Sequence, residues 1–339
     1  MSKPVKIGLV GFGRIGRNLY RIGYNNPNYQ FVAISDLGEP EALHYLLMRD
    51  SVHGPMKEEA RIEDNHLIFG RQKSRILKGG NPGDIPWDAF DVDVVIDATG
   101  KFREKADLEK YMDAGAKRVI VTVPPLDDVD RVVVVGVNDK EISADDKIVT
   151  CTSSTVHVLA LMLQILDENY GLKRAMMTTV HAYTSDQPLA DTARSDLRRS
   201  RSAVENIIPN QTWAPGIVEQ ILPRFAGKLD GLAFNVPVPD GSCIDLTAEL
   251  NTIPSIEELN AAVKAASEGK FKGIVGYTED PIVSSDVIGI NESLIHDAKA
   301  TMSVNGKMVK TVSWFDNGWG YSRRILETID AYSRLEVQS

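Results

Sequence analysis

The 339-residue chain contains only two cysteines, Cys151 and Cys243. Two cysteines do not make a disulfide framework, so we expect a protein of a reducing compartment, the cytoplasm. No block of like charges stands out, and 38 basic against 47 acidic residues give a net charge of −9. Nucleic acid is therefore not an expected partner. No unit of about 20 to 50 residues repeats, which excludes a solenoid.

Long apolar runs are also absent. The most apolar stretch, residues 156–166, contains His157 and Gln164 and is far shorter than the roughly 20 residues of a membrane span. The first residues, MSKPVKIGLVGFGR, have no apolar segment of the signal-peptide type before Arg14. We therefore expect no membrane partner and no signal peptide. Apolar residues are 43% of the chain and charged residues 25%, which is typical of a globular protein, and the length predicts two domains.

Short apolar runs alternate with helical patterns in the first 150 residues. The expected strands are 5–10, 31–35, 93–97, 118–123, 131–135 and 148–150, and the expected helices are 15–24, 39–48 and 104–114. Apolar runs without alternation are typical of parallel strands that are covered on both faces. The pattern predicts a doubly wound α/β domain with a mostly parallel sheet.

The pattern changes after Cys151. Residues 155–167 are apolar on every side, which predicts a buried helix. A capping box of Ser255 and Glu258 begins another helix that reaches about Ala266. Alternating strands are expected at 175–180, 229–236, 242–250, 299–304 and 307–314, with the last two joined by a turn at Asn305-Gly306. Together these elements predict an α+β second domain with a largely antiparallel sheet. The segment 184–209 is too long for a simple connection, so we expect it to be functional.

A glycine motif follows the first strand and opens the first helix. The sequence Gly11-Phe-Gly13-Arg-Ile-Gly16 is followed 20 residues later by Asp36 at the end of the next strand. Gly11 permits a tight turn, Gly13 lets the backbone approach a pyrophosphate, and Gly16 allows close helix packing. Asp36 can accept hydrogen bonds from a ribose and would repel a 2′-phosphate. The motif predicts NAD, rather than NADP, as cofactor.

The chain also resembles the phosphorylating glyceraldehyde-3-phosphate dehydrogenase family, which includes erythrose-4-phosphate dehydrogenases. The resemblance rests on six segments in order: residues 11–17, 50–54, 98–100, 136–138, 181–184 and 312–317. It implies a Rossmann domain at 1–153, a catalytic domain at 154–316, and a helix within 317–339 that returns to the first domain. It also implies a homotetramer, with the 184–209 segment near the subunit interface and the cofactor.

The resemblance implies the chemistry as well. In the family a cysteine thiolate attacks an aldehyde, a histidine takes the proton, a hydride passes to NAD and phosphate cleaves the thioester. Here Ser154 stands at the nucleophile position and His181 at the base. Ser153 and Thr155 match flanking substrate- or phosphate-binding positions. We expect Ser154 to impair the reaction, because a serine hydroxyl is much less acidic than a thiol and depends on a general base.

Two explanations for Ser154 remain open: a deliberate replacement of a natural cysteine to trap complexes, and a natural protein without the thiol that is a weak or altered enzyme. Cys151 is interpreted as a small packed residue rather than a substitute nucleophile, and His157 as a helix-packing residue. The leading hypothesis is an NAD-dependent aldehyde dehydrogenase of this type, and the alternative is a catalytically silent NAD-binding homologue with a binding or regulatory role.

The remaining site residues are carried over from the family. Gly11, Gly13, Arg14, Ile15, Asp36, Thr99, Gly100, Thr122 and Asn317 are expected to bind the cofactor, with Asn317 beside the nicotinamide carboxamide. For an aldehyde substrate and inorganic phosphate the candidates are Thr184, Arg198, Thr212, Trp213 and Asn235. Trp213 stands where the family has glycine, and Asn235 stands where it has arginine, so the preferred aldehyde and its phosphorylation stay open. We assign no metal-binding residues.

Overall fold

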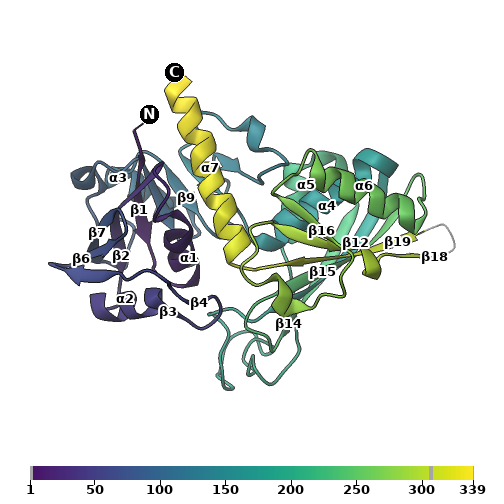
Figure 1. Cartoon of the computed structure of the whole chain (residues 1–339), viewed down its shortest axis with the longest axis horizontal. Helices are drawn as coiled ribbons and strands as arrows, with labels where there is room; N and C mark the ends of the chain where they lie inside the picture. Colours follow the sequence, from purple (N-terminus) through teal and green to yellow (C-terminus); the bar gives the residue numbers. More distant parts are fainter. Residues whose placement is uncertain (1–2, 305–307, 339) are drawn as a thin grey trace. The chain divides into compact units, whose positions relative to one another are not determined.

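The structure, a computed structural model, describes residues 3–304 and 308–338. The chain divides into two compact units (Figure 1), each considered by itself. The first unit extends to Ser153 and includes the C-terminal residues from Ser322 on. The second unit is Ser154–Tyr321.

The first unit is built on one twisted sheet. In hydrogen-bonded order its strands are β10 (Arg131–Val132), β11 (Ile148–Thr150), β9 (Val119–Val121), β8 (Val94–Asp97), β1 (Val5–Val10), β2 (Tyr29–Asp36), β7 (Gln72–Lys78), β6 (His66–Phe69) and β5 (Arg61–Glu63). Neighbours from β10 through β7 are parallel, whereas β6 and β5 continue the sheet antiparallel. The strands β3 (Arg49–Asp50) and β4 (Gly54–Pro55) form a separate short pair.

Helices of the first unit are α1 (Arg14–Gly23), α2 (Pro40–Met48), α3 (Lys105–Asp113) and most of α7 (Trp319–Gln338), with 3-10 turns η1 (Trp87–Phe90) and η2 (Asp139–Glu141). The core includes Trp87, Val95 and Tyr111, each almost fully buried. The yellow helix α7 in Figure 1 is tied to this unit by Tyr332, whose hydroxyl donates to Asp146 Oδ2 at 2.9 Å. The C-terminal helix therefore completes the first unit's core.

The second unit contains the other large sheet. Its hydrogen-bonded order is β13 (Ile208–Asn210), β14 (Leu229–Val236), β12 (Leu172–Ala182), β15 (Ser242–Leu250), β19 (Met308–Phe315), β17 (Leu294–Asp297) and β16 (Val275–Thr278), with β18 (Met302–Val304) paired to β19. The pairs β12/β14 and β16/β17 are parallel, and the other neighbours are antiparallel.

Three helices accompany this sheet: α4 (Ser154–Tyr170), α5 (Ala214–Ile221) and α6 (Ile256–Glu268). Helix α4 packs against α5, α6 and the central strands β12, β15 and β19, and its side chains from Thr155 to Leu166 are all buried. The capping box is present, since Glu258 N donates to Ser255 Oγ and Ser255 N donates to Glu258 Oε2. The 3-10 turns here are η3 (Pro223–Phe225), η4 (Ser284–Val287) and η5 (Ala298–Ala300).

The predicted fold class is confirmed: a doubly wound, mostly parallel sheet and an α+β unit with a largely antiparallel sheet. The strand predicted from Lys299 is wrong at its start. Asp297 Oδ1 accepts from the N–H groups of Lys299 and Ala300, which closes the turn η5, and β18 begins only at Met302. The predicted Asn305-Gly306 turn lies outside the described residues. No helix in the described ranges is long and apolar enough to cross a membrane.

The sheet of the first unit also differs from the sequence prediction at both of its ends. The run 131–135 forms only the two-residue strand β10, because Asn138 takes over the next backbone groups: its Nδ2 donates to Val132 O and its Oδ1 accepts from Val134 N. The three strands between Arg61 and Lys78 were not predicted. The predicted sheet therefore ended at β2 and lacked the three strands beyond it, β7, β6 and β5.

Candidate active site

The turn between β1 and α1 requires its glycines. Gly11 has φ +84°, and a Cβ there would lie 3.0 Å from the backbone of Ala98 and Thr99. A Cβ on Gly16 would overlap the carbonyl oxygen of Gly11. A Cβ on Gly13 would meet nothing within 4 Å, so the backbone at the start of α1 is open to a ligand. Arg14 and Ile15 form the first turn of α1, whose backbone N–H groups favour an anion.

Asp36 ends β2 and is fixed beside this turn. Its Oδ2 accepts from Phe12 N at 2.6 Å, and its Oδ1 accepts from Gly38 N at 2.8 Å. Each carboxylate oxygen keeps a further lone pair. Asp36 can therefore hold the glycine turn in place and still accept hydrogen bonds from ribose hydroxyls.

Thr99, Gly100 and Thr122 follow the neighbouring strands β8 and β9. Asp97 Oδ1 accepts from both Thr99 N and Thr99 Oγ1, at 2.8 and 2.6 Å, and Asp97 Oδ2 accepts from Tyr111 OH. Burial raises the pKa of the Asp97 carboxyl, although these hydrogen bonds oppose the shift. Thr122 N donates to Asp97 O. The predicted cofactor residues of the first unit thus gather at the carboxyl edge of β1, β2, β8 and β9, where doubly wound sheets bind ligands.

His181 and Asn235 lie opposite each other in the second unit, on the parallel strands β12 and β14. The ring nitrogen Nδ1 of His181 lies 2.7 Å from Ala182 O. A carbonyl oxygen can only accept, so Nδ1 carries the proton and Nε2 keeps its lone pair in the neutral ring. His181 therefore has the tautomer that a general base needs at Nε2.

Ser154 is the first residue of α4 and is partly buried. The N-terminal end of this 17-residue helix carries partial positive charge, which favours a developing anion. Two residues earlier, Thr152 has φ +54°, a left-handed conformation that is strained for a β-branched residue by about 1–3 kcal/mol. Ser153 is also partly buried, and Thr155 is buried. The backbone turn at Thr152 therefore leads directly into α4, and Ser154 is the first residue of that helix.

Cys151 and His157 have structural positions. Cys151 is fully buried, its Sγ lies 3.5 Å from Thr328 Oγ1, and burial raises its pKa to about 12. His157 is 1% exposed and contacts the ring of Tyr321 edge-on. A thiol that stays neutral at ordinary pH is a poor nucleophile, so Cys151 is not a substitute for the cysteine of the family.

The predicted phosphate residues are spread over separate segments. Thr212 Oγ1 accepts from Ala214 N at the start of α5, and the neighbouring Trp213 is 62% exposed. The Trp213 indole thus lies largely in solvent rather than filling the interior. In the 184–209 segment, the Thr184 hydroxyl donates to Asp186 Oδ1. Arg198 is exposed, and its backbone N–H donates to Asp196 Oδ1. Of the predicted residues, only Asn235 is paired in register with His181.

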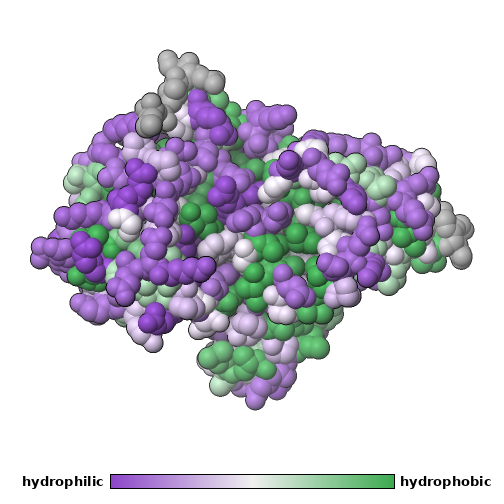
Figure 2. All heavy atoms as spheres, viewed as in Figure 1, coloured by the Kyte–Doolittle hydropathy of each residue, from purple (hydrophilic) through white to green (hydrophobic). Residues whose placement is uncertain are grey.

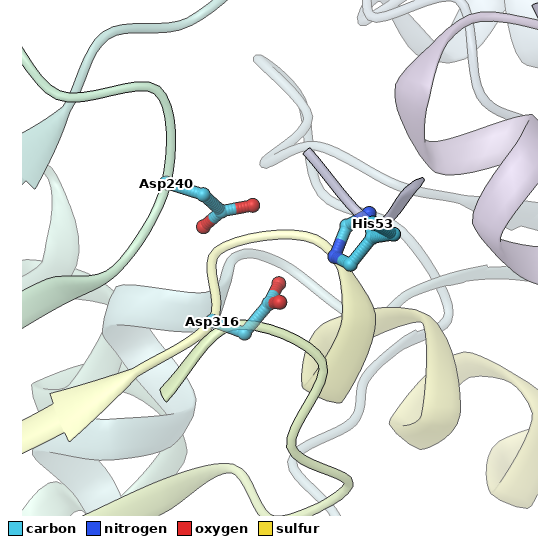
Figure 3. A group of neighbouring side chains, drawn as sticks. All are labelled: His53, Asp240 and Asp316. Carbon is cyan, nitrogen blue, oxygen red and sulfur yellow. The ribbon is translucent and has the colours of Figure 1, made fainter. Parts of the chain in front are cut away.

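Asn317 follows β19 and is held by its backbone. Its N–H donates to Asp240 Oδ1 at 2.9 Å; Figure 3 shows Asp240 on the loop before β15 and Asp316 at the end of β19. Its side-chain Oδ1 accepts from Ser242 Oγ, whereas its Nδ2 is buried and has no hydrogen-bond partner among the described residues. An amide donor without a partner fits a ligand that offers a carbonyl oxygen, as a nicotinamide carboxamide does.

The sequence prediction missed several residues of these networks, among them Asp97 and Ser242. An acid directly after the apolar run of β8 and before Thr99-Gly100 is a signal that could have marked Asp97. Ser242 gives no such signal, because its partners are Ala182 and Asn317, 60 and 75 residues away.

The fold and the glycine turn are those of a two-unit dinucleotide-binding protein. Two family models match the chain: the NAD binding domain of glyceraldehyde 3-phosphate dehydrogenase over residues 5–105, and its C-terminal domain over 150–317. The chain is 44% identical over 324 residues to glyceraldehyde-3-phosphate dehydrogenase 1 of Bacillus subtilis, covering 95% of this chain and 96% of the relative. It is 43% and 44% identical to glyceraldehyde-3-phosphate dehydrogenases of Geobacillus stearothermophilus and Streptomyces coelicolor, with 95% of this chain covered in each case, and 96% and 97% of the relatives.

The chain therefore belongs to the glyceraldehyde 3-phosphate dehydrogenase family. The predictions of this family, of an NAD-dependent enzyme and of NAD as the cofactor are confirmed.

The charge of Asp36 gives a first prediction. Replacing Asp36 by alanine removes an acceptor for ribose hydroxyls and the charge that repels a 2′-phosphate. We expect Asp36→Ala to bind NAD about tenfold more weakly, the effect of losing roughly 1.4 kcal/mol, and to discriminate less against NADP. Calorimetric titration of both variants with both cofactors measures the change. Equal affinity of the unmodified chain for NAD and NADP would contradict this role.

Proposed function

We propose that this chain oxidises glyceraldehyde 3-phosphate, or a closely similar phosphorylated aldehyde, with NAD and inorganic phosphate. The main structural support is the tautomer of His181, which the 2.7 Å contact between Nδ1 and Ala182 O indicates. The curated relatives of the chain are named as glyceraldehyde-3-phosphate dehydrogenases. Ser154 forms the covalent adduct with the aldehyde carbon. His181 Nε2 takes the proton that Ser154 Oγ loses.

When NAD is bound, it supplies a hydride acceptor. The glycine turn and Asp36 are the residues that would hold the dinucleotide, and Asn317 Nδ2 would donate to its carboxamide. The tetrahedral adduct on Ser154 Oγ collapses to an ester as it loses its hydride. Phosphate then attacks the ester carbonyl, and Ser154 Oγ leaves with the proton that His181 returns.

An oxygen nucleophile slows this sequence at two steps. Serine ionises far less readily than cysteine, and its ester is a poorer acyl donor than a thioester. The serine at position 154 also supports a second candidate function: an NAD-binding homologue without turnover, acting by binding or regulation. The two candidates differ in one measurable property, which is NADH formation.

The direct test follows NADH formation by the unmodified chain with glyceraldehyde 3-phosphate, with and without phosphate. Slow formation that depends on phosphate supports the enzyme. Tight NAD binding without any NADH, and with no gain when a thiol is placed at position 154, supports the silent homologue instead.

Asn235 supplies a second prediction, on phosphate binding. It is 8% exposed and in register with His181, and it offers neutral hydrogen bonds only. Hydrogen bonds to charged groups are about twice as strong as neutral ones. In a Ser154→Cys background, Asn235→Arg should lower KM for glyceraldehyde 3-phosphate or for phosphate about five- to tenfold.

Asn235→Gln is the matched control, since it adds length without charge and should leave both KM values within about twofold. Steady-state kinetics with each substrate varied in turn separate the two constants. Unchanged or higher KM values in Asn235→Arg would show that the site is not a weakened phosphate clamp, and other aldehydes would then have to be tested.

We further propose a homotetramer. Large apolar side chains are exposed along the 184–209 segment and beside it: Leu189, Leu197, Val204, Ile207 and Trp213. Figure 2 shows hydrophobic atoms gathered over the loops at the bottom of the view, where Figure 1 traces this segment in teal. Apolar groups gathered in this way favour association with another surface.

We also propose that the protein is cytoplasmic. Cys151 and Cys243 are both free thiols, which suits an enzyme of the cytoplasm.

A further inference from the structure

Ser242 connects the residues proposed for catalysis and cofactor binding in the second unit. It begins β15, is 1% exposed, and its Oγ lies 2.9 Å from Ala182 N and 2.5 Å from Asn317 Oδ1. The backbone N–H of Ala182 can only donate, so Ser242 Oγ accepts from it. The hydroxyl proton then remains for Asn317 Oδ1.

This order of donors fixes the Asn317 amide. With Oδ1 facing Ser242, both donors have an acceptor: the Ala182 N–H donates to Ser242 Oγ, and the Ser242 hydroxyl donates to Asn317 Oδ1. With the amide reversed, the Ser242 hydroxyl proton would lose that acceptor. The Asn317 Nδ2 group is therefore directed away from Ser242, and it is the buried donor that has no partner among the described residues.

The same alanine also holds the base. Ala182 N binds Ser242 Oγ, and Ala182 O accepts from His181 Nδ1. Asp240 Oδ1 fixes the Asn317 backbone at the other end, at 2.9 Å from its N–H. Ser242 thus lies in one continuous network from the imidazole of His181 to the carboxamide of Asn317.

We propose that Ser242 is a positioning residue that presents Asn317 Nδ2 as a donor, and so selects a cofactor ring carrying a carboxamide oxygen. This role rests on the proposed function of the site. It concerns the nicotinamide end of the cofactor and not its adenosine or pyrophosphate. ADP-ribose, which has no nicotinamide, therefore separates a positioning effect from a general one.

The test is calorimetric titration of Ser242→Ala with NAD and with ADP-ribose. Losing the hydroxyl frees the Asn317 amide to turn, so NAD affinity should fall about three- to tenfold, as for one lost hydrogen bond, while ADP-ribose affinity stays unchanged. Ser242→Thr retains a hydroxyl and should restore most of the NAD affinity. Ser293→Ala is the matched control, because Ser293 is also buried but its Oγ has no hydrogen-bond partner in the described part of the chain; neither affinity should change.

Equal losses for NAD and ADP-ribose, or no loss for NAD, would overturn the positioning role. If Ser242→Ala does not fold, Ser242→Cys keeps the shape with a weaker donor and must show the same selective loss of NAD affinity. Failure of the unmodified chain to bind either ligand would overturn the NAD site itself. A selective loss in a chain that forms no NADH would support the Ser242 role and count against the proposed reaction.

Discussion

Ser154→Cys is expected to raise the rate of NADH formation with glyceraldehyde 3-phosphate and phosphate by about three orders of magnitude or more. The reason is the ionisation of the nucleophile. A thiol with a pKa of about 8.5 is readily converted to thiolate by a histidine and a helix N-terminus, and position 154 begins the helix α4. In the proposed reaction, a serine at the same place must lose its proton to His181 during the attack. Elsewhere, loss of an activated nucleophile costs a factor of about 10⁶.

The matched control for this gain is Ser293→Cys, which places a buried thiol elsewhere in the second unit, at a residue with no part in the proposed site. We expect its rate to stay within about threefold of the unmodified chain, because covalent catalysis needs an aligned nucleophile. The chain also carries an internal control in Cys151, which is fully buried and has a pKa raised to about 12. Rates are measured as NADH formation, and iodoacetamide labelling counts the reactive thiols. No gain for Ser154→Cys, in a variant that binds NAD normally, would favour the silent homologue.

The first unit could be predicted well where the sequence pattern is local. The strand β1, the glycine turn, α1 and Asp36 all lie within the first 36 residues, and their spacing reflects steric needs that Gly11 and Gly16 meet. The strands β5–β7 were missed because residues 61–78 are rich in charged and polar side chains, including Arg61, Glu63 and Lys73. Such strands are ordered by pairing with β2 and with one another, which a local pattern does not reveal.

The site shows the same division between local and distant contacts. The resemblance supplied Ser154, His181 and Asn317 as candidates. His181 is held by the carbonyl oxygen of its neighbour Ala182, whereas the donor and acceptor that hold Asn317, Ser242 Oγ and Asp240 Oδ1, lie 75 and 77 residues away along the chain. Ser242 reaches Asn317 only because β15 pairs with both β12 and β19. The exposure of Trp213 could not be predicted either, since a bulky residue at a glycine position suggests crowding, whereas the indole lies largely in solvent.

The second large effect concerns His181. In the Ser154→Cys background, His181→Gln should lower kcat/KM about 10²- to 10⁴-fold, the usual contribution of a general base. His181 has its proton fixed on Nδ1 by Ala182 O, and its ring contacts Phe315 edge-on at 6.0 Å between centroids. With Nδ1 protonated, the lone pair of the neutral ring is on Nε2, the atom that takes the proton in the proposed reaction. Glutamine can fill the space but cannot accept a proton near neutral pH.

The pH dependence distinguishes loss of a base from loss of packing. Without His181, the thiol at position 154 must ionise unaided, so kcat/KM and the rate of iodoacetamide labelling should both rise with pH until about 8.5, the ordinary pKa of cysteine. With His181 present, labelling should already be fast near pH 7. His157→Asn in the same background is the matched control: His157 is buried, contacts Tyr321 edge-on and has no role in the proposed reaction, so activity per folded molecule should change by less than about threefold. If His181→Gln lost no more activity than this control, or kept the labelling profile of its parent, His181 would not be the base, because a general base must set both the attack and its dependence on pH.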